Sequence, residues 1–123
     1  MARKKILVVD DSKTAMLMQL MILRKGPYDL VTASDGEEGV AKALSERPDL
    51  ILMDLVMPRM NGLQAIRELR RCDSTRQIPV IVVSTRGEAE SLEAGFESGC
   101  NDYLTKPIDG VALLAKVRVH LGA

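Results

Sequence analysis

Three short apolar runs recur along the sequence, and each is followed by a segment whose apolar residues have helical spacing. The runs are too short for helices and are rich in Val, Ile and Leu, which is typical of strands buried on both faces. These runs predict strands at 6–9, 50–53 and 79–83, and the sequence also predicts a fourth, weaker strand at 30–33 and a fifth, short one at 101–104. This alternation is the feature that most constrains the fold.

Capping and turn residues mark the ends of the helices that are expected between the predicted strands. Ser, Asp and Asn side chains accept hydrogen bonds from the free N–H groups of a first helical turn. Glycine and proline end a helix or interrupt it. The predicted N-caps are Ser12, Asp35, Asn61 and Asp109, and the predicted stops are Gly26, Pro27, Pro48 and Gly99. The fourth helix is predicted from about residue 88 to residue 98, after Gly87.

Strands that alternate with helices predict a parallel sheet with helices on both faces. Right-handed crossovers then favour a doubly wound α/β fold with a five-stranded parallel sheet. The 123 residues suit one domain, spanning 1–123, and no linker or second domain is visible.

The charge balance, the length of the apolar stretches and the cysteine spacing argue against several classes of function. Lys plus Arg equals Asp plus Glu at 17 each, which argues against the basic field of a nucleic-acid binder. No apolar stretch reaches the roughly 18 residues of a membrane span. Cys72 and Cys100 lack metal-ligand spacing and are expected to be reduced thiols. We therefore expect a cytoplasmic protein that binds neither membrane nor nucleic acid.

Polar side chains stand where the predicted strands end. Asp10 and Asp11 follow the first strand, Asp54 the third and Ser84 the fourth, while Lys106 follows the fifth. The carboxyl ends of parallel strands share one edge of a sheet, where ligands bind in open α/β folds. The sequence therefore predicts three carboxylates, a hydroxyl and an ammonium at one site.

Three neighbouring carboxylates need compensation, and Mg²⁺ prefers oxygen ligands. A carboxylate such as Asp54 can be a nucleophile that forms an aspartyl-phosphate. Each residue also has a simpler interpretation. Asp10 and Asp11 could simply cap a helix, Ser84 could simply end a strand, and Lys106 could be an ordinary turn residue at the surface. Their combination at four strand ends is more specific than any one of them.

Four motifs carry a resemblance to a known family. They are residues 6–12 (ILVVDDS), 54–62 (DLVMPRMNG), 79–84 (PVIVVS) and 103–107 (YLTKP). With these motifs, the chain resembles the receiver domains of two-component response regulators over essentially its whole length. The single-domain, chemotaxis-regulator type is the most similar. The resemblance implies a flavodoxin-like (βα)5 fold and a role in bacterial signal transduction.

The resemblance also implies residue roles. Asp54 would accept a phosphoryl group from the phosphohistidine of a histidine kinase or phosphotransfer protein. Asp11, Asp54 and the backbone carbonyl of Val56 would bind Mg²⁺, with Asp10 acting mainly through water. Lys106 would contact the phosphoryl group. Catalysis would be limited to the domain's own phosphorylation and slow dephosphorylation.

A conformational switch is implied as well. Ser84 would move toward the phosphoryl group, and the Tyr103 rotamer would report the change. The Lys106–Pro107 peptide bond is expected to be cis. The fourth helix, fifth strand and fifth helix would then present an altered face to a downstream protein, and phosphorylation-linked homodimers are possible.

Three positions differ from the commonest family pattern or are expected to adjust the phosphorylation chemistry. Thr85 is bulkier than the residue that often follows the switch hydroxyl, and it is expected to narrow access to the phosphoryl group. Val56 cannot hydrogen bond an attacking water, so we expect slow self-dephosphorylation. Arg86 could reach the phosphoryl group or face solvent. Elsewhere, we expect His120 at the surface and the methionines from Met16 to Met21 in the core.

Two other functions stay open from the sequence. An aspartyl-phosphate hydrolase would usually place a second acid two residues after the nucleophile, where this chain has Val56. A pure interaction module would keep the fold and lose phosphoryl uptake. The chain is also compatible with a receiver excised from a longer regulator.

Overall fold

The computed structural model describes residues 3–85, 87 and 89–122. Five parallel strands form one sheet in the order β2-β1-β3-β4-β5. The strands are β1 (Lys4–Val9), β2 (Tyr28–Ala33), β3 (Leu50–Met53), β4 (Val80–Ser84) and β5 (Asp102–Thr105). The predicted doubly wound, five-stranded parallel sheet is confirmed.

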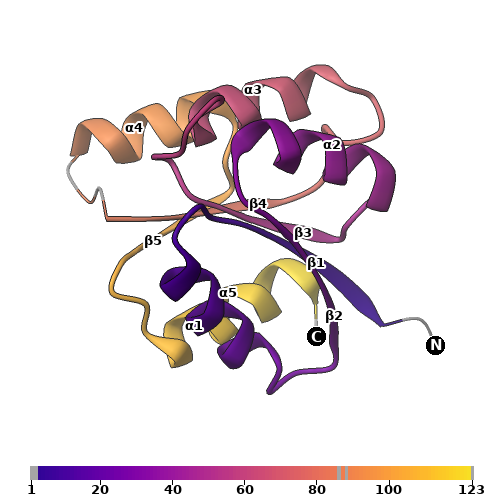
Figure 1. Cartoon of the computed structure of the whole chain (residues 1–123), viewed down its shortest axis with the longest axis vertical. Helices are drawn as coiled ribbons and strands as arrows, with labels where there is room; N and C mark the ends of the chain where they lie inside the picture. The colour runs from indigo at the N-terminus through magenta and orange to yellow at the C-terminus, as the bar shows by residue number, and fades with distance from the viewer. Residues whose placement is uncertain (1–2, 86, 88, 123) are drawn as a thin grey trace.

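Five helices alternate with the strands. They are α1 (Lys13–Leu23), α2 (Gly36–Glu46), α3 (Gly62–Arg71), α4 (Ala89–Ser98) and α5 (Gly110–Leu121). Figure 1 shows α2, α3 and α4 on one face of the sheet and α1 and α5 on the other. Among the described residues, no helix has both the length and the apolar character that crossing a membrane requires.

The predicted caps begin four of the helices. Ser12, Asp35, Asn61 and Asp109 each accept a hydrogen bond from a backbone N–H two or three residues later. In α3 the Gln64 side chain also accepts from the Asn61 N–H at 3.0 Å, which completes a capping box. The predicted start of the fourth helix at residue 88 lies outside the described residues, and α4 is described from Ala89.

Strand boundaries differ from the prediction by one or two residues. β1 begins at Lys4 and β2 at Tyr28, because these two residues pair in register although Lys4 is polar. β4 and β5 each extend one residue further toward the carboxyl edge, where Ser84 pairs with Thr105. Backbone pairing, which does not depend on side-chain polarity, sets these ends.

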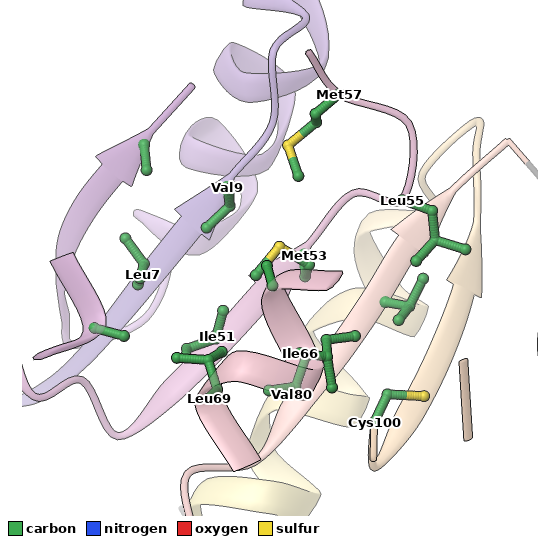
Figure 2. Packing of buried hydrophobic residues seen from close by; sticks show 14 of the residues in the cluster. Leu7, Val9, Ile51, Met53, Leu55, Met57, Ile66, Leu69, Val80 and Cys100 are labelled. Carbon is green, nitrogen blue, oxygen red and sulfur yellow. The ribbon is translucent and has the colours of Figure 1, made fainter. Parts of the chain in front are cut away.

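The sheet separates two apolar layers. Alternate strand residues such as Leu7 and Ile51 form one apolar cluster with residues of α2, α3 and α4. Figure 2 shows Leu7 and Ile51 in this cluster together with Ile66 and Leu69 of α3. Their neighbours, such as Ile6 and Leu52, pack against α1 and α5. Burial on both faces explains why β1, β3 and β4 contain continuous apolar runs, whereas the edge strands β2 and β5 are partly exposed.

The prediction that the α1 methionines lie in the core is wrong for two of them. Met16 packs against the core, whereas Met18 and Met21 are exposed, together with Leu17. α1 is an outer-layer helix, so only one of its faces can reach the sheet even though its sequence is apolar nearly all round.

Alanine is expected to destabilise the fold at one helix-starting glycine and to have little effect at another. A Cβ at Gly62 would clash with the Asp54 carbonyl oxygen, whereas a Cβ at Gly110 meets only Ile22 at ordinary contact distances. We expect Gly62→Ala to lower the free energy of unfolding by about 1–3 kcal/mol. The control Gly110→Ala changes it by less than about 1 kcal/mol. Urea unfolding measures both, and equal effects would contradict the close approach.

Candidate functional site

Three carboxylates meet at the carboxyl edge of the sheet because β1 and β3 are neighbours. Val9 pairs with Met53, so the residues that follow them lie side by side. The Asp54 N–H donates to the Val9 carbonyl at 3.0 Å. One carboxylate oxygen each from Asp10, Asp11 and Asp54 lies within 4.8 Å of the others. We call this set the acidic cluster.

Lys106 brings a positive charge to the acidic cluster from β5. Its Nζ lies 2.8 Å from Asp10 Oδ2 and 3.7 Å from Asp54 Oδ2. Its backbone N–H donates to the Ser84 carbonyl at 2.8 Å, and the bond to Pro107 is cis as predicted. Three ionised carboxylates minus one ammonium leave two negative charges, which suits a divalent cation.

Asp10 is held by more partners than the sequence indicated. Its Oδ1 accepts from the Ser12 N–H at 2.9 Å, and its Oδ2 accepts from Gln19 Nε2 at 3.2 Å. Gln19 is buried and was not among the predicted site residues. The available signal was a single amide side chain within the otherwise apolar stretch 15–23. These contacts fix one Asp10 rotamer beside Lys106.

The environment of Asp54 raises its pKa to about 6. Burial is the largest cause, since the residue is only 6% exposed, and the charge of Asp10 adds to it. Lys106 and hydrogen bonds from the backbone N–H groups of Leu55 and Val56 act in the opposite direction. A cation bound at the acidic cluster would therefore favour the ionised carboxylate that a nucleophile requires.

The two predicted switch residues lie at different depths. Ser84 is fully buried at the last position of β4, one strand from Asp54. Tyr103 lies in the core under α4, where its ring edge is close to Gly95. Thr85 is exposed at the edge of the site beside Lys106, and Arg86 lies outside the described residues.

His120 is less exposed than we expected. Only 19% of its side chain is exposed, and its Nε2 lies 3.1 Å from Asp102 Oδ2. Lys116 Nζ lies 2.8 Å from the other oxygen of the same carboxylate. The three residues connect α5 to β5, which a reading of the helix alone could not reveal.

Comparison with known proteins agrees with this geometry. Residues 6–118 match the family described as the response regulator receiver domain. Protein PilH of Pseudomonas aeruginosa is 43% identical over 117 residues, which cover 95% of this chain and 97% of PilH. The chain belongs to the response regulator receiver domain family. This receiver domain is a phosphoacceptor signalling domain of a two-component system.

Solved structures of receivers have the same fold. Chemotaxis protein CheY4 of Vibrio cholerae superposes with a TM-score of 0.91 at 32% identity, covering 98% of this chain and 100% of CheY4. The receiver of sensor histidine kinase PA1611 from Pseudomonas aeruginosa, solved with magnesium in its active-site cleft, gives 0.92 at 30% identity, covering 99% and 100%. Several further relatives are longer regulators, and the chain spans about half of their length.

The raised pKa of Asp54 predicts a pH-dependent gain in stability for Asp54→Asn in metal-free protein. The folded pKa of about 6 exceeds the ordinary value of 3.8, so the folded state binds more protons between these two pH values. Stability contributed by the protonated carboxyl is complete below about pH 4 and is lost as pH rises through about 6. Asp54→Asn escapes this loss and gains about 1–3 kcal/mol near pH 7.5, with almost no gain near pH 4.

Urea unfolding in a chelator at the two pH values measures the gain. Asp73→Asn is the matched control, because the Asp73 side chain is 95% exposed. It should change the difference between the two pH values very little. An equal gain from Asp54→Asn at both values would contradict the buried, charge-crowded carboxylate.

Proposed function

We propose that Asp54 accepts the phosphoryl group from a phosphohistidine of a histidine kinase or phosphotransfer protein. The observation that carries this proposal is a buried carboxylate held between the oxygens of Asp10 and Asp11 and the ammonium of Lys106. An Asp54 oxygen forms a bond to phosphorus while the phosphorus–nitrogen bond breaks. The electron pair stays on the imidazole, which then takes up a proton from solvent.

The acidic cluster fits Mg²⁺. Its donors are hard oxygens, they lie within reach of one ion, and their charge exceeds that of Lys106. Asp11, Asp54 and the Val56 carbonyl would hold the ion, with Asp10 acting through water. When bound, Mg²⁺ neutralises charge on the transferring phosphoryl oxygens. The magnesium in the PA1611 receiver structure supports this assignment.

Lys106 and Ser84 have separate roles in this proposal. Lys106 already lies 3.7 Å from an Asp54 oxygen, so its ammonium can contact a phosphoryl oxygen and stabilise the charge there. Phosphorylation adds about −1.5 to −2 charges at Asp54. The Ser84 hydroxyl can then donate a hydrogen bond to a phosphoryl oxygen, and this interaction, which exists only in the phosphorylated state, supplies the differential interaction that a two-state switch requires.

We propose that the response is read on α4, β5 and α5. Movement of Ser84 would free space for Tyr103, a β5 residue whose ring packs beside α4. The helices that flank β5 carry exposed apolar side chains, Phe96 on α4 and Val111 and Val119 on α5. Such side chains suit a downstream protein or a second copy of the domain.

The remaining assignments follow from the same site. Residues 1–123 form one receiver domain in this proposal. The domain catalyses its own phosphorylation and slow dephosphorylation, and no other reaction. Val56, which is 51% exposed two residues after Asp54, offers no acid to a leaving group, which disfavours a hydrolase.

Phosphoryl uptake tests the acceptor directly. Incubation with Mg²⁺ and acetyl phosphate should add a single phosphoryl mass to the wild type. Asp54→Asn should show no adduct, and neither should the wild type in a chelator, because the nucleophile or the counter-charge is missing. Intact-protein mass spectrometry measures all three. An adduct of equal yield on Asp54→Asn would overturn the assignment of the acceptor.

Val56 predicts a long phosphoryl lifetime. An amide at this exposed position could orient water toward the phosphoryl group, so Val56→Asn should shorten the lifetime by about an order of magnitude. Val111 is also an exposed valine but lies far away in the sequence on α5, so Val111→Asn is the control and should not change the lifetime. Loss of the phosphoryl adduct with time after removal of the donor gives both rates, and equal lifetimes would contradict the role of Val56.

A further inference from the structure

We propose that an ion pair between Arg59 and Asp35 positions the loop after β3, and thereby sets the affinity of the acidic cluster for Mg²⁺. This loop, residues 55–61, carries the Val56 carbonyl. The inference rests on the proposed function, because it concerns the same metal site. Arg59 and Asp35 are positioning residues, since neither belongs to the acidic cluster.

Arg59 has an unusual backbone conformation. Its φ is 63°, in the left-handed region that favours glycine. The other described non-glycine residue with positive φ is Arg47, which caps the end of α2, where such a conformation is common. Arg59 ends no helix. A non-glycine residue keeps this unfavourable backbone conformation only when contacts with its surroundings hold it there, and such residues are common at functional sites.

The side chain of Arg59 supplies that restraint. Its Nε and Nη2 donate to the same oxygen of Asp35, at 3.0 and 2.6 Å. The Asp35 side chain is only 5% exposed, whereas that of Arg59 is 66% exposed. The hydrogen bond from the Glu38 N–H and the pairing with Arg59 hold the pKa of Asp35 below its ordinary value. The anchor is therefore a charged group fixed at the start of α2.

A backbone contact reinforces the ion pair. The Gly36 N–H donates to the Met60 carbonyl at 3.0 Å. A Cβ at Gly36 would clash with that carbonyl oxygen, so only glycine permits this approach. Two successive residues of the loop, Arg59 and Met60, are thus bound to two successive residues at the start of α2.

The other part of the loop reaches the acidic cluster. Leu55 directly follows Asp54, and the backbone N–H groups of Leu55 and Val56 lower the pKa of the Asp54 carboxyl. The Gly62 N–H donates to the Leu55 carbonyl at 3.0 Å and closes the loop on itself. Only Met57 and Pro58 separate Val56 from Arg59. Release of Arg59 would therefore free the segment that places the Val56 carbonyl, and small displacements of a ligand weaken binding strongly.

The chain offers a matched pair of variants. Arg59→Gly and Arg47→Gly both replace an arginine at positive φ by glycine, and only the first removes the ion pair with Asp35. Asp35→Asn keeps an oxygen for the N-cap and removes the charge. The double variant Asp35→Asn with Arg59→Gly tests whether the two residues act together.

Calorimetric titration of the metal-free proteins with MgCl₂ measures the effect. We expect about ten-fold weaker binding for Arg59→Gly and for Asp35→Asn, at the lower end of what loss of an outer-shell partner costs. The double variant should bind no more weakly than either single variant, and Arg47→Gly should bind like the wild type. Saturating Mg²⁺ should restore phosphoryl uptake from acetyl phosphate. Amide NMR of metal-free Arg59→Gly should show a shifted Val56 signal.

Two results would overturn the proposal. One is wild-type Mg²⁺ affinity in folded Arg59→Gly, which would leave the ion pair a stabilising role only. The other is an equal loss of affinity in Arg47→Gly. If the wild type takes up phosphoryl with Mg²⁺ while Arg59→Gly binds Mg²⁺ normally, only the positioning role fails. If the wild type neither binds Mg²⁺ nor takes up phosphoryl, the proposed function fails with it.

Discussion

The crowding of negative charge at the ends of β1 and β3 is the constraint on which the rest of this structure depends. Parallel pairing of the neighbouring strands β1 and β3 forces Asp10 and Asp54 together in a buried position. Burial and mutual repulsion raise the pKa of Asp54, and Lys106 offsets part of the charge. The remaining charge disfavours the metal-free folded state, and it creates the attraction for a cation and a phosphoryl group.

Side chains from several helices and loops hold the crowded carboxylates and the neighbouring loop in place. Gln19 on α1 and Lys106 after β5 both bind Asp10 Oδ2, from segments far apart in the sequence. On the opposite side, the loop after β3 is tied to the start of α2 by Arg59. A site built from strand ends is thus made rigid by side chains from helices and loops. Rigid placement of this kind is what electrostatic stabilisation of phosphoryl transfer requires.

Local patterns explain which expectations succeeded. The caps Ser12, Asp35, Asn61 and Asp109 act within three residues, so the sequence contains all the information that they need. Apolar runs identify buried strands for the same reason. Expectations were wrong where the outcome depends on contacts between distant parts of the sequence. The exposure of Met18 and Met21 depends on which face of α1 meets the sheet, and the partial burial of His120 accompanies its contact with Asp102 in another element.

The sequence by itself determined the order of elements, the doubly wound parallel sheet and the set of residues at the carboxyl edge, because periodicity, capping and parallel topology follow from local chemistry. Only the tertiary structure decided how those residues meet. The pairing of Lys106 with Asp10, the amide of Gln19 and the Arg59–Asp35 ion pair each join segments at least nine residues apart. Contacts of that kind depend on packing in three dimensions, which no spacing along the chain encodes.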